Sequence, residues 1–249
     1  MARAGIALQM YTVREDARKD FVGTIRRVAE IGYPAIELAG YGGMTALELK
    51  NVVDDAGLKV MGSHLGLSTL ESALEREIEY NAILGNHDLI CPALPKERRQ
   101  DAASFREVAT TFNAIGRRCR ELGARFSYHI HGHEFQRFGD RTGMDILIEQ
   151  TDPEFVFWEP DTYWIIRAGE DAVAWIRRNA ARCPLIHLKD PSPAPAQTDT
   201  EIGEGTLDLA AVFAAASHAE WYVVEQEDFV RPPMESVAIS LRNLTERLT

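Results

Sequence analysis

The feature of the sequence that most restricts its fold is a regular alternation of short apolar runs with longer stretches of helical periodicity. Eight apolar runs are typical of buried strands, at residues 4–10, 35–38, 58–64, 87–91, 123–128, 155–159, 185–189 and 221–225. Apolar residues three and four apart predict helices over 21–31, 44–56, 69–84, 101–122, 144–150, 170–179 and 235–248. Apolar strands alternating with helices favour a parallel sheet with helices outside it. Eight such strands, alternating with the predicted helices in 249 residues, predict a (β/α)8 TIM barrel, a single α/β domain over residues 1–249.

An open, doubly wound sheet is the main alternative fold. It is disfavoured because no Gly-x-Gly-x-x-Gly turn, the mark of its dinucleotide-binding version, follows the first strand. No linker indicates a second domain. The stretch 191–200, which is rich in Pro, Ala and Thr, is expected to form one long loop after the seventh strand. Loops of this length are often lids or binding loops.

Charge and composition exclude several classes of function. The net charge of −11 would repel a phosphate backbone, so we expect no nucleic-acid partner. No apolar run approaches the ~20 residues that span a bilayer, and residues 1–5 do not resemble a signal peptide, so no membrane partner is expected. Three widely spaced cysteines, Cys91, Cys119 and Cys183, fit a reducing compartment and have no zinc-type spacing. These features predict a cytoplasmic protein.

Polar residues gather where the predicted strands end, which is where a barrel of this kind places its active site. Seven of the eight strands end in side chains that could ligate a metal, titrate or hydrogen-bond a sugar: Gln9, Tyr11, Glu37, His64, His129, His131, Glu159, Asp161, His187, Lys189, Glu225 and Glu227. Each has a structural alternative as well. Glu37 could cap a neighbouring helix, and His64 could be a hydrogen-bonded structural histidine. These residues meet at one spot only if the chain forms the barrel.

The segment 128–135, YHIHGHEF, concentrates three histidines and one carboxylate. Alternate side chains of a strand share a face, so His129, His131 and His133 would point the same way if the fifth strand ran that far, with Glu134 on the loop beyond. Imidazoles with a carboxylate suit a divalent metal of intermediate softness. The alternative is a solvated loop that happens to be rich in histidine.

Six short motifs resemble the sugar phosphate isomerase/epimerase family, which belongs to the xylose isomerase-like barrels. They are QMYTVR at 9–14, YHIH at 128–131, DTYW at 161–164, HLKD at 187–190, GEGTLD at 203–208 and VEQE at 224–227. The resemblance runs from the first strand to the last. It implies a xylose isomerase-like (β/α)8 barrel that holds one divalent metal, Mn²⁺ foremost, with Mg²⁺, Zn²⁺ or Co²⁺ as alternatives. It also implies a homodimer or a homotetramer.

The same resemblance implies a ligand set from the ends of strands five to eight. The family uses Glu, Asp, His and Glu there, and Asp161, His187 and Glu225 match the last three. The first position falls on His129, a departure that a Tyr-His-Asn-His branch of the family shares. His129 is the preferred fourth ligand because of its register after Tyr128, with His131 and Glu134 as alternatives.

The resemblance further implies an isomerase or epimerase that removes the proton next to a sugar carbonyl through an enediolate. The metal would act as a Lewis acid, and Glu225 would serve as one acid–base group. Glu134 or His131 would be the second, and Lys189 would hold a substrate oxygen or assist as an acid. The sugar pocket would be lined by Gln9, Tyr11, Glu37, His64 and Trp164. Dehydration or β-elimination of a keto-sugar uses the same proton abstraction and is the alternative reaction.

The expected substrate is a sugar or keto-sugar, since the sequence has no glycine-rich phosphate cradle and few cations near strand ends. Two other functions compete with this one. An apurinic-site endonuclease on the same barrel would need more metal ligands and a basic surface, which the charge of −11 opposes. A catalytically idle sugar-binding barrel is the other, because His129 replaces a family glutamate.

Overall fold

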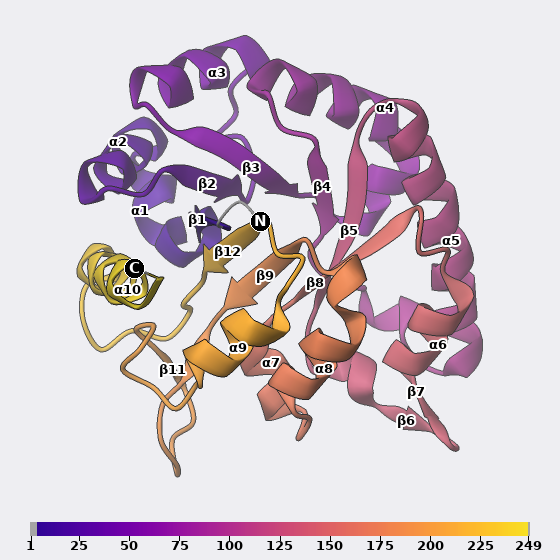
Figure 1. Ribbon diagram of the computed structural model, residues 1–249. Coiled ribbons are helices and arrows are strands. Elements are labelled where there is room, and N and C mark those ends of the chain that lie inside the picture. Colours follow the sequence, from indigo (N-terminus) through magenta and orange to yellow (C-terminus); the bar gives the residue numbers. More distant parts are fainter. Residues whose placement is uncertain (1–3, 249) are drawn as a thin grey trace.

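Eight parallel strands form a ring in the computed structural model, which describes residues 4–248 (Figure 1). The order around the ring is β8-β5-β4-β3-β2-β1-β12-β9. The strands are β1 (Gly5–Gln9), β2 (Ala35–Leu38), β3 (Lys59–His64), β4 (Asp88–Cys91), β5 (Arg125–Ile130), β8 (Val156–Pro160), β9 (Leu185–Leu188) and β12 (Trp221–Val224). Every neighbouring pair in this order is parallel.

The ring is closed between β8 and β9 by one isolated bridge, which pairs Asp161 with His187. An open doubly wound sheet would leave these two end strands apart. The predicted (β/α)8 barrel is therefore confirmed, and the open alternative is wrong.

The helices lie outside the ring (Figure 1). They are α1 (Arg14–Lys19), α2 (Phe21–Ile31), α3 (Ala46–Asp55), α4 (Leu67–Leu84), α5 (Ala102–Glu121), α6 (Gly143–Gln150), α7 (Thr162–Arg167), α8 (Ala172–Asn179), α9 (Leu209–Ala215) and α10 (Pro233–Leu248). The helix predicted over 101–122 corresponds to α5, whose apolar face, including Phe105 and Phe112, is buried. No helix within residues 4–248 combines the length and the apolar character needed to cross a membrane.

Several short elements differ from the sequence-based expectation. The segment 191–200 is more than a loop, because β10 (Asp190–Pro191) and β11 (Asp199–Thr200) pair in antiparallel fashion at its base. A second small hairpin joins β6 (Arg137–Phe138) to β7 (Arg141–Thr142). Together with α1, α7 and α9, these elements are too short to show a periodic pattern, so tertiary contacts decide them.

The interior of the barrel changes from apolar to polar along the strands. A cluster of Ala7, Ala35, Met61, Ile90, Leu185 and Val223 fills the lower interior. Side chains two residues apart on a strand share a face, so the layer above contains residues that follow members of this cluster. In this way Ala7 is followed by Gln9, Ala35 by Glu37, Leu185 by His187, and Val223 by Glu225. The strand geometry itself therefore gathers polar groups at one end of the barrel.

The segment after β11 is held against α10 by a buried carboxylate, Glu201. Its oxygens accept hydrogen bonds from the Ser236 hydroxyl at 2.7 Å and the Thr200 hydroxyl at 2.8 Å, and Arg231 lies 2.8 Å away. Burial alone would raise the pKa of Glu201, but the hydrogen bonds from Ser236 and Arg231 outweigh it and lower the pKa to about 2. The ionised carboxylate thus stabilises the folded state.

We expect Glu201→Gln to lower the free energy of unfolding near neutral pH by about 1–3 kcal/mol, because hydrogen bonds to a charged acceptor are lost. A lowered pKa contributes stability above the ordinary value of 4.5, and that contribution is lost as pH falls towards about 2. Urea unfolding of both proteins over this range should show their difference shrinking as pH falls. A difference that stays constant with pH would contradict this role.

Candidate metal centre and active site

Four donor side chains converge at the polar end of the barrel. His129 lies on β5 and His187 on β9, while Asp161 follows β8 and Glu225 follows β12. One nitrogen or oxygen of each lies within 4.8 Å of the others. His187 Nδ1 is 3.0 Å from Glu225 Oε2, and His129 Nε2 is 4.0 Å from Asp161 Oδ2. We call these four residues the outer donors; they are the four residues that the family resemblance implies as ligands.

The outer donors fit a divalent cation. Asp161 is fully buried; its Oδ1 accepts the backbone N–H of Trp164 at 3.0 Å, but its Oδ2 has no hydrogen-bond partner. An unpartnered buried carboxylate oxygen is costly, and a cation would satisfy it. Two imidazole nitrogens with two carboxylate oxygens suit a metal of intermediate softness. The outer donors would therefore hold a cation through one atom each.

Two further carboxylates, Glu37 and Glu159, lie next to the outer donors and are completely buried. We call them the inner carboxylates. Glu159 Oε2 is 3.0 Å from His129 Nδ1, and Glu37 Oε2 is 2.8 Å from His187 Nε2. His64 Nε2 lies between them, 3.0 Å from Glu159 Oε2 and 3.1 Å from Glu37 Oε2. The group His64, His129, Glu159 and His187 is thus a second set whose ligand atoms lie within 4.8 Å of one another.

Glu159 is a site residue whose role the sequence does not reveal. Its position could be found from strand periodicity, since it stands two residues before Asp161 and faces the same side of the barrel wall. Its register partner on the neighbouring strand is His129. Strand pairing therefore places a carboxylate beside the one histidine of the fifth strand.

Burial and opposite charges shift the titration of this cluster. Burial raises the pKa of Asp161 to about 7, although Lys189 opposes the shift. Burial would also raise the pKa of Glu225, but the hydrogen bond and charge of His187 lower it to about 2. Burial, aided by the neighbouring His187, holds the pKa of His129 well below its usual range, so its imidazole is neutral. The buried carboxylates and imidazoles of this cluster are nevertheless a donor set that suits a divalent cation.

A cavity of about 350 Å³ opens above the outer donors. Its lining combines titratable side chains with small apolar ones: Tyr11, Ala39, His64, Pro92, Ala93, His129, His131, Glu225 and Glu227. Three residues predicted to act on or hold the substrate, Tyr11, His64 and His131, therefore face the same space as two of the outer donors. Trp164 lines an adjoining cavity that shares His131 with this one.

Two of the predicted sugar-binding residues lie behind the metal centre instead. Gln9 and Glu37 are fully buried, and the Gln9 amide donates to Glu37 Oε2 at 2.6 Å. Neither lines the cavity above the outer donors. Glu37 in turn contacts His187 and His64.

The histidine-rich segment does not continue as a strand, because β5 ends at Ile130. His133 begins a 3-10 turn and lies 2.8 Å from Glu134 Oε1. The buried Glu134 accepts hydrogen bonds from the Tyr128 hydroxyl and from the backbone N–H of His131, the latter at 3.0 Å. The carboxylate of Glu134 therefore points towards the start of its own loop.

Lys189 is buried at the side of the site. Its ammonium group donates to Glu227 and lies 3.4 Å from Asp199. The same nitrogen stands 5.1 Å from the centre of the Trp164 ring and 5.3 Å from that of Tyr163. This lysine is a fixed positive charge between the β9 end and the cavity.

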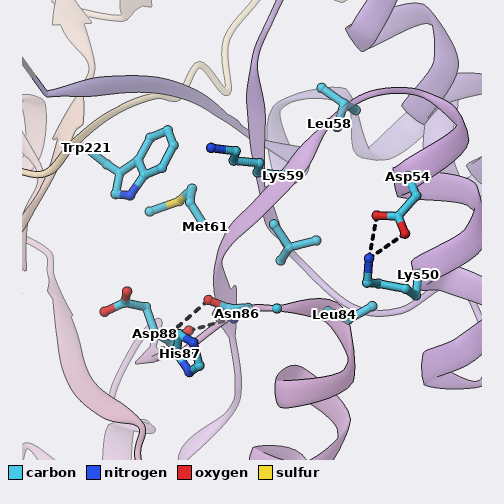
Figure 2. A pocket seen from close by; sticks show the side chains of 12 residues that line it. Lys50, Asp54, Leu58, Lys59, Met61, Leu84, Asn86, His87, Asp88 and Trp221 are labelled. Atoms are coloured by element: carbon cyan, nitrogen blue, oxygen red, sulfur yellow. Dashed lines mark hydrogen bonds and ion pairs between the residues drawn. The ribbon is translucent and has the colours of Figure 1, made fainter.

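A larger cavity, of about 450 Å³, lies at the opposite end of the barrel (Figure 2). Its walls carry Lys59, Asp88 and Trp221, which stand at the starts of their strands, and the Lys50–Asp54 ion pair. None of the predicted site residues lines it. Since barrels of this class carry their chemistry at the carboxyl ends of the strands, the smaller cavity is the candidate active site.

Comparisons with known proteins agree with this architecture. A family model described as "Xylose isomerase-like TIM barrel" matches residues 25–247. An inosose dehydratase of Geobacillus kaustophilus is 25% identical over 244 residues, covering 82% of this chain and 79% of the relative. A sugar phosphate isomerase/epimerase structure from Parabacteroides distasonis superposes with a TM-score of 0.85 at 25% identity, over 98% of this chain and 94% of that one. The IolI protein with a bound zinc atom superposes with a TM-score of 0.75 at 12% identity, over 98% of both chains.

We expect the buried hydrogen bond between Tyr128 and Glu134 to stabilise the loop after β5. We expect Tyr128→Phe and Glu134→Leu each to lower the free energy of unfolding by about 1–3 kcal/mol, because a buried partner is left unsatisfied. Since both changes break one hydrogen bond, the double variant should lose clearly less than the sum of the two. Urea unfolding of the four proteins measures this coupling, and additive losses would show that the two residues act independently.

Proposed function

This chain belongs to the xylose isomerase-like TIM barrel family, and from that premise we propose that it is a divalent-metal-dependent enzyme that removes a proton next to the carbonyl of a keto-sugar or related keto-polyol. The observation that carries the proposal is the convergence of the outer donors, His129, Asp161, His187 and Glu225, beneath a cavity with further titratable groups. A bound cation would act there as a Lewis acid towards the substrate carbonyl. The side chains around the cation would accept and transfer the proton.

We assign proton transfer to His131 and Glu225. Both line the cavity, and the His131 ring centre lies 4.7 Å from that of His129. His131 would reach a substrate atom held over the outer donors from the side of the loop, and Glu225 would reach it from the end of β12. Glu134 supports this arrangement by accepting the backbone N–H of His131. We therefore propose Glu134 as an indirect contributor to catalysis.

Lys189 would stabilise negative charge that develops on a substrate oxygen. Its ammonium group is held by Glu227, which lines the cavity. A buried cation at this place could also deliver a proton to a departing hydroxyl group, as general acid catalysis requires. Among the described residues, those that line the cavity include no lysine or arginine, which favours an unphosphorylated substrate.

Loss of water is the reaction that we favour after the proton leaves. The inosose dehydratase relative matches most of this chain, and elimination from a cyclic keto-polyol begins with the same proton abstraction. The second candidate is return of a proton, which gives epimerisation at the other face of the same carbon or isomerisation at the neighbouring carbon, and the name of the Parabacteroides distasonis structure favours it. The cation would be Mn²⁺ or the Zn²⁺ that the IolI structure carries. A homodimer or homotetramer stays a prediction.

The experiment that tests the function uses protein stripped of metal and reloaded with Mn²⁺ or Zn²⁺. Inososes, 3-keto-glucosides and ketoses are incubated with it in D₂O and followed by NMR and mass spectrometry. Elimination gives a product lighter by one water, whereas epimerisation gives an isomer that has gained deuterium. Absence of both changes with every cation would refute the proposal.

Asp161→Asn should separate cation binding from folding. Asn can still cap α7 as Asp161 does, so the fold should persist, but one anionic ligand is lost. We expect cation affinity to fall by more than the ~10–100-fold typical of changes to residues that only support a ligand. Asp171→Asn is the matched control, because Asp171 caps α8 in the same way. Equal cation affinity of the two variants, measured by chelator competition, would remove Asp161 from the ligand set.

A further inference from the structure

The two histidines of the outer donors each use both ring nitrogens. His129 turns Nε2 towards Asp161 Oδ2 and places Nδ1 3.0 Å from Glu159 Oε2. His187 has the opposite arrangement, with Nδ1 3.0 Å from Glu225 Oε2 and Nε2 2.8 Å from Glu37 Oε2. Each imidazole thus stands between an outer carboxylate and an inner one.

A neutral imidazole carries one N–H and one lone pair, and only the lone pair can bind a metal. The N–H of each ring must therefore face away from the cation. An ionised carboxylate can only accept hydrogen bonds, so a carboxylate behind the ring selects the tautomer whose proton points to it.

We propose that Glu159 and Glu37 are positioning residues that set the tautomers of the metal-binding histidines. Glu159 holds His129 in the Nδ1–H form, and Glu37 holds His187 in the Nε2–H form. Nε2 of His129 and Nδ1 of His187 are then free to bind the cation together with Asp161 and Glu225. This inference rests on the metal-dependent function proposed above and extends it to residues that do not touch the cation.

The inner carboxylates are suited to setting the tautomers because their positions are fixed and they are shielded from water. Both are fully buried, so water does not compete for their oxygens. Glu159 is held by the register of β5 and β8, which pairs it with His129. Glu37 is held by the Gln9 amide at 2.6 Å, and the same oxygen accepts from His187.

A second cation among His64, His129, Glu159 and His187 is the competing interpretation of the same distances. It would share His129 and His187 with the outer donors, so each ring would have to bind a metal through both nitrogens and lose both protons. With the protons kept, the inner distances of 2.8 to 3.0 Å are ordinary N–H···O hydrogen bonds. His64 then donates from Nε2 to Glu159 or Glu37.

The first test reads the tautomer directly in metal-free wild-type protein. Two-dimensional ¹⁵N NMR of the imidazole rings at mildly alkaline pH distinguishes a protonated from an unprotonated nitrogen, and His129→Gln identifies the His129 signals. We expect His129 to carry its proton on Nδ1. A His129 ring protonated on Nε2 would overturn the proposal, and this measurement needs neither a cation nor a substrate.

The second test measures cation affinity by chelator competition. Glu159→Leu should bind Mn²⁺ or Zn²⁺ about 10–100-fold more weakly than wild type and release His129 into the other tautomer. Glu159→Gln should recover most of the affinity, because its amide oxygen can accept the same proton. Glu77→Gln is the control, since Glu77 is a buried glutamate that accepts from the Tyr41 hydroxyl and has no contact with the outer donors. Unchanged affinity in Glu159→Leu would contradict the proposal.

The number of cations bound per chain distinguishes the remaining outcomes. One cation per wild-type chain supports the proposal, whereas two, with one lost in Glu159→Leu, would overturn it in favour of the second cation. A wild-type chain that binds no cation but shows the Nδ1–H form of His129 would refute the metal-dependent function and leave the tautomer assignment standing.

Discussion

Four carboxylates shielded from water, those of Glu37, Glu159, Asp161 and Glu225, stand at one end of the barrel, and the local structure is arranged around their charge. Three imidazoles lie among them and provide hydrogen bonds of 2.8 to 3.0 Å. Buried charges are tolerated only when they are paired, so this cluster needs its protons or a cation. Glu37, Glu159 and Asp161 each have one buried oxygen without a hydrogen-bond partner, and Asp161 also forms the bridge to His187 that closes the ring. The same pair of residues therefore takes part in the closure of the barrel and in the proposed metal site.

The barrel provides this cluster by repetition. Every second side chain of each strand points into the barrel. Two inward-facing residues that are two positions apart on a strand therefore belong to successive layers of the interior. The polar layer lies directly above the apolar one. The inner carboxylates face the same barrel interior as the outer donors that they contact. The outer donors and the inner carboxylates thus lie on strands or directly after them, and the hydrogen bonds behind His129 and His187 restrict these two rings further.

The groups proposed to act on the substrate come from less regular segments. His131 lies just past β5, Lys189 just past β9, and Trp164 on the six-residue α7. The family shares its barrel among dehydratases and epimerases, as the names of the relatives show. A fold does not decide which of these reactions follows proton removal. We expect these less regular segments, which carry the groups proposed to act on the substrate, to decide which reaction follows.

The sequence by itself determined the eight strands, most of the helices, the barrel and the strand ends at which the four outer donors lie, because periodicity and strand ends are local properties of a chain. The choice of these four residues among the polar groups at strand ends came from the family resemblance. It could not show that β5 stops at Ile130, that Glu134 turns to Tyr128, or that Gln9 and Glu37 stand behind His187. Nor could it separate Glu159 from the other polar residues at strand ends. These arrangements depend on strand register and on which buried groups find partners, and both arise only when segments distant in the chain pack together. Tertiary structure alone decided which histidine nitrogen each carboxylate faces, and the roles that we propose for the carboxylates follow from those contacts.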